Sequence, residues 1–187
     1  MKKGKIMLIF GISGVGKTYY ENLLAKKFNM YSLKKVTTRK KREKEKNKCV
    51  SREQFEEMIN NNEFFIYTQI YDEYYGYEKQ EIERIEEGFY LIGDCYYKLI
   101  EKLRELLGED LITVCIQPYD LQNTLKLIKD ERVDYKQRIE SANKEYMYLK
   151  NNKHFFDYYF YTKYDATTDD EIVLQISKCI QNKMEVN

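Results

Sequence analysis

Residues 11–18 read Gly11-Ile12-Ser13-Gly14-Val15-Gly16-Lys17-Thr18, which fits the pattern G-x-x-x-x-G-K-[ST]. Glycines at these places let consecutive backbone N–H groups turn inward around phosphate oxygens, which side chains would obstruct. Lys17 is expected to reach the β- and γ-phosphates of ATP, and the Thr18 hydroxyl to bind Mg²⁺. The residues expected to hold ATP are Gly11, Ser13, Gly14, Val15, Gly16, Lys17 and Thr18.

The segments on either side of this loop have the character that a phosphate site requires. Residues 6–10 form a short apolar run, which is typical of a parallel strand buried on both faces. Residues 19–28 read as a helix with Leu23, Leu24 and Phe28 on one side. The positive N-terminal end of that helix would face the bound anion. This setting favours a nucleotide site over a glycine turn that binds nothing.

Along the rest of the chain, strands alternate with helices, which predicts an α/β domain with a parallel sheet of about five strands. Further strands are expected at residues 89–92, 111–116 and 155–161, and helices at 51–60, 79–87, 97–107, 121–149 and 169–183. The aromatic and β-branched stretch 63–77 predicts strands or extended loops. Residues 34–48 are highly charged without an apolar period, so we expect an exposed, mobile segment.

Composition narrows the class of protein. The chain has 187 residues, the size of one domain, and a formal net charge of +1, so nucleic acid and membranes are not expected as main partners. Its four cysteines lie far apart without metal-ligand spacing and read as reduced thiols of a cytoplasmic protein. No segment approaches the ~20 apolar residues that a membrane span needs. The oligomeric state cannot be read from the sequence.

A second motif follows the loop. Lys35-Val36-Thr37-Thr38-Arg39-Lys40-Lys41-Arg42 resembles the S-x-T-T-R-x-P-R element of guanylate kinases, and Tyr74-Tyr75-Gly76 resembles their Y-Y-G. The resemblance implies that Arg39, Arg42 and Tyr75 bind the phosphate of an acceptor monophosphate. Guanidinium groups suit that role because they match phosphate oxygens in bidentate geometry.

The likeness to guanylate kinases continues along nearly the whole chain in the right order. Residues 50–64 resemble the F-x-x-M-I-x-x-x-x-F helix, and residues 88–94 resemble the G-x-x-x-I-L-D strand that ends at Asp94. Residues 116–118 resemble I-x-P-P, residues 138–145 resemble the R-L-x-x-A-x-x-E lid helix, and residues 156–158 resemble the start of F-D-x-x-x-x-N. Each element alone is a weak signal, but their order and spacing are specific.

The resemblance implies a three-layer P-loop NTPase fold with a core (1–33, 80–120 and 142–187), a nucleoside monophosphate-binding insertion (34–79) and a lid (121–141). It also implies lid arginines, for which Arg138 matches directly and Arg132 is a looser candidate. Together with Lys17 and Arg39, these would stabilise the phosphoryl group during transfer. Catalysis of this kind depends on positioning and positive charge, without a covalent enzyme intermediate.

The base-binding positions depart from the family pattern. Guanine is usually held by two carboxylates and a hydroxyl, and Asp94 keeps one carboxylate. Ile66 stands where the family has Glu, Tyr77 where it has Ser, and Lys35 where it has the Ser four positions before the first arginine. An unpaired guanine donor costs ~1–3 kcal/mol. We therefore predict activity on GMP or dGMP that is weaker or less selective than the family norm, with Lys35, Arg39, Arg42, Tyr75 and Asp94 binding the acceptor.

Two other functions stay open at this point. One is a kinase of another phosphorylated small molecule, such as a ribose phosphate, since Arg39, Arg42 and Tyr75 would serve it equally well. The other is a non-catalytic guanylate kinase-like interaction module. The presence of Lys17 and Thr18 argues against the second, because such modules tend to lose the loop lysine.

Overall fold

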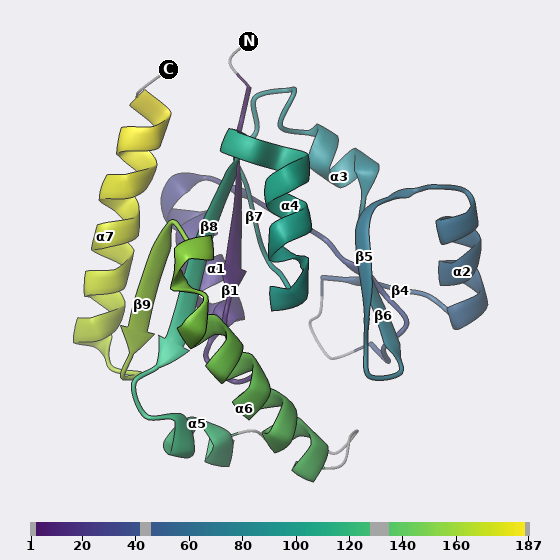
Figure 1. Ribbon diagram of the computed structural model, residues 1–187. Helices are drawn as coiled ribbons and strands as arrows, with labels where there is room; N and C mark the ends of the chain where they lie inside the picture. Colours follow the sequence, from purple (N-terminus) through teal and green to yellow (C-terminus); the bar gives the residue numbers. More distant parts are fainter. Residues whose placement is uncertain (1–2, 42–45, 128–134, 186–187) are drawn as a thin grey trace. The chain divides into compact units, whose positions relative to one another are not determined.

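The computed structural model describes residues 3–41, 46–127 and 135–185, and contains two sheets (Figure 1). The five-stranded sheet has the strand order β2-β7-β1-β8-β9, and the four-stranded sheet has the order β4-β3-β6-β5. The predicted α/β class and the sheet of about five strands are confirmed. The chain forms two compact units, residues 1–7 with 25–93 and residues 8–24 with 94–187.

Parallel pairing defines the five-stranded sheet, whose members are β1 (Ile6–Phe10), β2 (Tyr31–Ser32), β7 (Leu91–Asp94), β8 (Leu111–Pro118) and β9 (Tyr158–Thr162). β2 runs parallel to β7 with Tyr31 opposite Leu91, and β8 runs parallel to β9 with Val114 opposite Tyr158. Every residue of β1 and of β8 is buried. Continuous burial is what a parallel strand covered on both faces shows.

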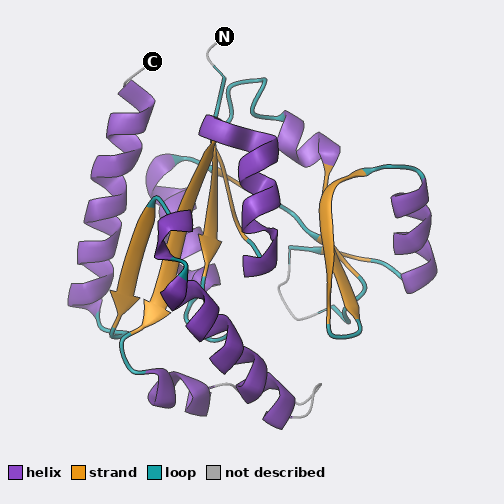
Figure 2. Ribbon diagram, in the orientation of Figure 1, coloured by secondary structure: helices purple, strands orange, loops and turns teal. Residues whose placement is uncertain are grey.

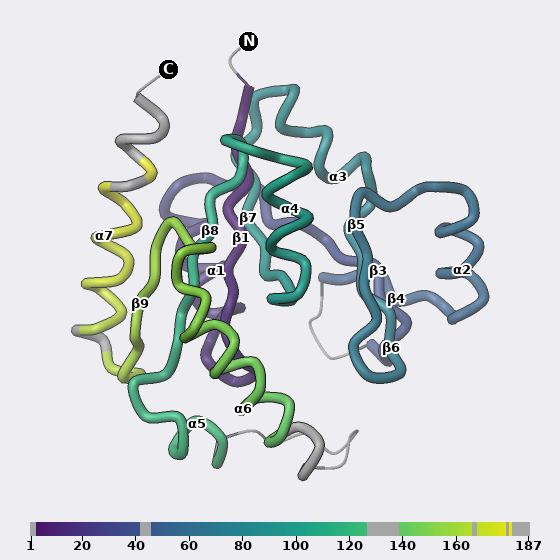
Figure 3. Tube along the Cα trace, in the orientation of Figure 1, coloured from purple at the N-terminus to yellow at the C-terminus, as the bar shows by residue number. Residues whose placement is uncertain are grey.

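The helices around this sheet are α1 (Lys17–Phe28), α4 (Ile100–Leu107), α5 (Leu121–Leu127), α6 (Tyr135–Asn151) and α7 (Ala166–Glu185). α7 runs alongside β9 (Figure 3) and buries Ile172, Ile176 and Ile180. Within the stretch 121–149, which was expected to be helical, α5 and α6 are described, and residues 128–134 lie outside the described part. None of the described helices is long and apolar enough to cross a membrane.

The four-stranded sheet belongs to the unit that contains residues 25–93, and it comprises β3 (Val36–Thr37), β4 (Lys48–Cys49), β5 (Phe64–Ile70) and β6 (Glu73–Glu78). Helix α2 (Arg52–Asn60) packs on it through Phe55 and Met58 (Figure 2). Ser51 caps this helix: its hydroxyl accepts from the Gln54 N–H, and the Gln54 side chain accepts from the Ser51 N–H at 2.9 Å. This reciprocal pair satisfies two donors at the start of the helix.

Three expectations from the sequence are corrected. Residues 34–48 are not exposed throughout, because Val36 and Thr37 of β3 are fully buried. Val36 packs beneath α2, and the Thr37 hydroxyl donates to the Tyr74 carbonyl at 2.8 Å. The helix expected at 79–87 is shorter, since α3 spans Lys79–Glu83, and the strand expected at 89–92 is β7, which begins two residues later.

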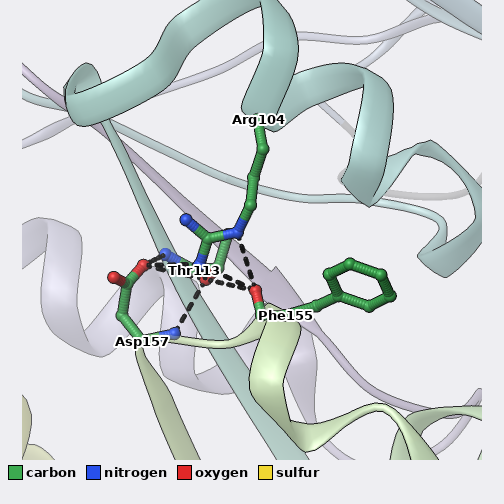
Figure 4. Close-up of polar contacts among 4 residues, drawn as sticks. All are labelled: Arg104, Thr113, Phe155 and Asp157. Carbon is green, nitrogen blue, oxygen red and sulfur yellow. Dashed lines mark hydrogen bonds and ion pairs between the residues drawn. The ribbon is translucent and has the colours of Figure 1, made fainter.

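A polar cluster fixes the start of β9 (Figure 4). The Asp157 carboxylate accepts from the backbone N–H and the hydroxyl of Thr113, both at 2.8 Å, and from Arg104 at 3.3 Å. Arg104 also donates twice to the Phe155 carbonyl, at 2.9 and 2.7 Å. The cluster therefore joins α4, β8 and the approach to β9, which gives the Phe-Asp motif near residue 156 a structural role.

Candidate active site

Backbone geometry makes the glycine loop a cradle. β1 leads directly into it and α1 begins at Lys17. Gly11 and Gly16 have φ angles of 151° and 92°, which side-chain-bearing residues rarely adopt. A Cβ atom on Gly11 would lie 2.2 Å from the carbonyl oxygen of Ile116 in β8. The loop consequently lies so close to β8 that only glycine fits at its first position.

The Lys17 ammonium is bound to the loop itself. Its Nζ atom donates to the carbonyl oxygens of Gly11 at 2.6 Å and Ile12 at 2.9 Å. Thr18, the next residue, is exposed at the first turn of α1. A loop of inward amides with a lysine and a hydroxyl at the helix start fits a triphosphate and a Mg²⁺ ion, which the Thr18 hydroxyl would hold.

Glu145 of α6 lies beside the glycine loop, a position that sequence reasoning missed. The pKa of its carboxyl is raised from 4.5 to about 7, chiefly by burial, and the nearby Asp94 carboxylate also acts to raise it. Lys17 and a hydrogen bond from the Ser13 backbone act in the opposite direction and lower this pKa. Glu145 and Asp94 therefore lie in the electrostatic field of the phosphate loop. The only sequence signal was the last letter of the R-L-x-x-A-x-x-E pattern.

Tyr20 anchors the helix that follows the loop. Its hydroxyl lies 3.0 Å from the Thr162 hydroxyl at the end of β9 and donates a hydrogen bond to Asp169 in the first turn of α7. Burial and the Asp169 carboxylate raise the pKa of this phenol, so it stays protonated and keeps donating. α1 is thereby held in place beside the loop.

In the other unit, the small sheet carries Tyr75 and leads to Arg39, two of the three residues expected to bind the acceptor phosphate. Tyr74 stacks on Phe55 with ring centroids 5.0 Å apart, so its neighbour Tyr75 points to the face away from α2. Thr37 lies opposite Tyr75 across the strands, and its hydroxyl accepts from the Arg39 N–H at 3.2 Å. Tyr75 and Arg39 are half-buried. Arg39 thus follows directly from the strand that pairs with Tyr75.

Comparison with known proteins shows the family to which this chain belongs. The family model described as guanylate kinase matches residues 3–182 of the 187. The chain belongs to the guanylate kinase family. It is 30% identical to a guanylate kinase of Porphyromonas gingivalis over 94% of this chain and 98% of that one. It is 29% identical to one of Clostridioides difficile, over 92% and 86%.

A solved structure shares the fold of this guanylate kinase family member. The guanylate kinase of Anaplasma phagocytophilum superimposes with a TM-score of 0.75 at 21% identity, covering 98% of this chain and 87% of that one. Members of the family are phosphotransferases that act on a nucleoside monophosphate with ATP as donor.

Several expected site residues of this guanylate kinase family member are described only in part. Asp94 lies at the C-terminal end of β7 and acts on Glu145, so the structure groups it with Lys17. Its expected role toward the base stays a prediction. Arg42 and Arg132 lie outside the described residues. Arg138 belongs to the first turn of α6, where the backbone but not its side chain is described.

Proposed function

We propose that the protein transfers the γ-phosphoryl group of Mg²⁺-bound ATP to GMP, dGMP or a related nucleoside monophosphate. One observation carries the proposal: the Lys17 ammonium is held on the loop carbonyls of Gly11 and Ile12, at the head of α1. When ATP binds, the ammonium would exchange these neutral carbonyl acceptors for charged phosphate oxygens. Bonds to charged acceptors are roughly twice as strong as neutral ones, which favours that exchange.

Each side chain has a distinct part in the proposed reaction. Lys17 and the loop amides hold the donor phosphates, and Thr18 holds Mg²⁺. Arg39, Arg42 and Tyr75 bind the acceptor phosphate, while Arg138 and Arg132 stabilise the charge on the transferring group. The chain supplies no nucleophile in this scheme, because the acceptor phosphate itself attacks in line. Rate enhancement then comes from positioning and positive charge.

We also propose that the protein is cytoplasmic, a setting that its cysteines favour. Cys49, Cys95 and Cys115 are all free thiols, and free thiols are typical of the reducing cytoplasm. We also propose residues 34–79 as the acceptor-binding part and residues 121–141 as the lid. The match to guanylate kinases over residues 3–182 favours a nucleotide over a sugar phosphate as acceptor.

The test is ADP release from Mg²⁺ and ATP with each of several monophosphates. The wild-type protein should release ADP in the presence of GMP, and Lys17→Ala should lower the rate by about 10³ or more. Lys26→Ala is the matched control, because Lys26 is an exposed residue of the same helix. No release with any monophosphate, or full activity of Lys17→Ala, would contradict the proposal.

A further inference from the structure

Tyr77 of β6 is a buried residue whose hydroxyl lies against β7. Its side chain is only 3% exposed. A Cβ atom placed on Gly93 would lie 2.6 Å from the Tyr77 hydroxyl oxygen and 3.2 Å from Leu33. No side chain fits at position 93 while the phenol is there. Tyr77 therefore occupies the space that a side chain of β7 would take, directly before Asp94.

The neighbours of Tyr77 are identified by strand register. Ile66 lies directly opposite Tyr77 across the β5–β6 pair and is also 3% exposed. The adjacent Gly76 faces Phe64 and Tyr67 on the α2 side, so Ile66 and Tyr77 point to the other face. That is the face of Tyr75, the residue expected to bind the acceptor phosphate.

Lys35 completes what we call the Tyr77 cluster, which consists of Lys35, Ile66 and Tyr77. The Lys35 Nζ atom lies 5.7 Å from the centre of the Tyr77 ring, within the range of a cation–π contact. The cluster presents a hydrocarbon side chain, an aromatic ring and a donor-only ammonium. It contains no carboxylate to accept hydrogen bonds from a base.

Position 77 and position 93 have changed in opposite directions relative to the family motifs. Tyr77 stands where the pattern has Ser, and Gly93 stands where G-x-x-x-I-L-D has Leu. Relative to those motifs, the residue on β7 is smaller and the residue on β6 is larger, at the point where the Tyr77 hydroxyl approaches Gly93. Exchanges that conserve volume are the ones that a packed interior tolerates. The contact geometry thus links the two changes as a pair.

We propose that Tyr77, seated on Gly93, fills the part of the acceptor site that would read the base, so that the kinase discriminates weakly among nucleoside monophosphates. The inference rests on the proposed function, because it concerns the acceptor of that reaction. The acceptor is then held mainly by its phosphate, through Arg39 and Tyr75, and Asp94 is the one carboxylate left to meet a base. Sites that hydrogen-bond a substrate reject analogues by about 10⁴–10⁵, whereas apolar contacts discriminate by only about 10–200.

The first experiment compares GMP, AMP, CMP and UMP in the wild-type protein. The ratio of kcat/KM between the best and the worst acceptor should be about 200 or less, the span that apolar contacts supply. A larger ratio in favour of any one base would overturn the inference. Equilibrium binding of the same monophosphates gives this ratio without turnover. Absence of ADP release with every acceptor would instead contradict the proposed function, while the binding ratios still decide the inference.

The second experiment replaces Tyr77 and Gly93 with the residues that the family motifs have at these two positions. Gly93→Leu alone should lower the melting temperature because the new side chain meets the Tyr77 hydroxyl, and Tyr77→Ser alone should lower it by leaving a cavity. The double variant Tyr77→Ser/Gly93→Leu should melt above both single variants. If the two effects simply add, the residues are not coupled, and the inference fails whatever the activity of the variants.

The third experiment concerns selectivity. Adding Ile66→Glu to the double variant supplies a carboxylate, and the preference for GMP over CMP should rise at least about tenfold, the effect of one good hydrogen bond. Tyr67→Ser is the matched control, because Tyr67 belongs to the same strand pair but lies on the α2 side. An unchanged preference in the triple variant, or an equal gain in Tyr67→Ser, would overturn the inference. A triple variant that does not fold leaves the wild-type ratio as the deciding measurement.

Discussion

The Nζ atom of Lys17 lies 2.6 Å from the carbonyl oxygen of Gly11, so the last cation of the loop is bound to its first residue. This contact closes residues 11–17 into a ring. The ring keeps its shape only if Gly11 stays at φ 151° and in close approach to Ile116 of β8. The position of the ammonium and the conformation of the glycine therefore depend on each other.

Gly11→Ala should disrupt this ring. The added methyl group would lie 2.2 Å from the Ile116 carbonyl oxygen, and the backbone would be strained by about 1–3 kcal/mol in addition. We expect a lower melting temperature and at least about tenfold weaker ATP binding, measured by calorimetry. Gly108→Ala is the control, since Gly108 also has a positive φ but nothing lies near its Cβ position. Equal effects of the two substitutions would mean that the approach to β8 is unimportant.

Arg39→Lys should weaken acceptor binding while it preserves charge. A lysine cannot form the two parallel hydrogen bonds that a guanidinium makes to a phosphate. We expect the KM for the monophosphate to rise about tenfold with the KM for ATP unchanged, in steady-state assays. Arg52→Lys is the comparison, because Arg52 stacks on Tyr74 with its guanidinium carbon 4.8 Å from the ring centre. A higher KM for ATP would indicate that Arg39 serves the donor instead.

Glu145 should make stability depend on pH. Its pKa is about 7 in the folded protein, against an ordinary value of 4.5. A raised pKa in a carboxyl means that the folded state prefers the protonated form, so the contribution of Glu145 to stability is fully present below its ordinary pKa of 4.5. It is lost as pH rises through the folded pKa, on the order of 2–3 kcal/mol between about pH 5 and pH 8.

Replacing Glu145 with Gln should remove that dependence, because the amide can still accept the Ser13 hydrogen bond without becoming charged. Melting temperatures measured across the same pH interval should fall for the wild-type protein and vary less for Glu145→Gln. Parallel curves for the two proteins would show that another group is responsible.

Asp157→Asn should destabilise the fold without touching the nucleotide site. The change removes the charge that Arg104 pairs with at 3.3 Å and turns one acceptor oxygen of the carboxyl into a donor. Both side chains are partly exposed, so we expect a loss of about 1–3 kcal/mol in the free energy of unfolding, measured with urea. Lys144→Ala, which breaks an exposed pair with Glu140, should cause no measurable loss.

The sequence was sufficient for features whose causes are local. The glycine loop, the buried run of β1 and the Ser51 cap each depend on a few consecutive residues, and all three conformations are present in the structure. The boundaries of α1 and of α2 were likewise within two residues. The alternation of apolar strands with helices is likewise visible along the sequence, and it predicts the α/β class.

Features that depend on residues far away in the sequence could not be predicted in this way. The two buried residues of β3 are too few to show a period, and their burial is caused by α2 and β6. Glu145 lies near the glycine loop only because helix α6 packs beside that loop. The sequence revealed that Tyr77 departs from the family pattern, but not that its hydroxyl lies against Gly93. The physical reason is the same in each case: burial is decided by what folds against a residue.

The Tyr20 hydroxyl ties the first helix of the chain to Thr162 and Asp169, which come 142 and 149 residues later. During synthesis on the ribosome, the glycine loop emerges early, yet its anchorage waits until the start of α7 has left the exit tunnel. Nascent chains stalled before that point should therefore retain little ATP, and the nucleotide site should mature as one of the last events of biogenesis.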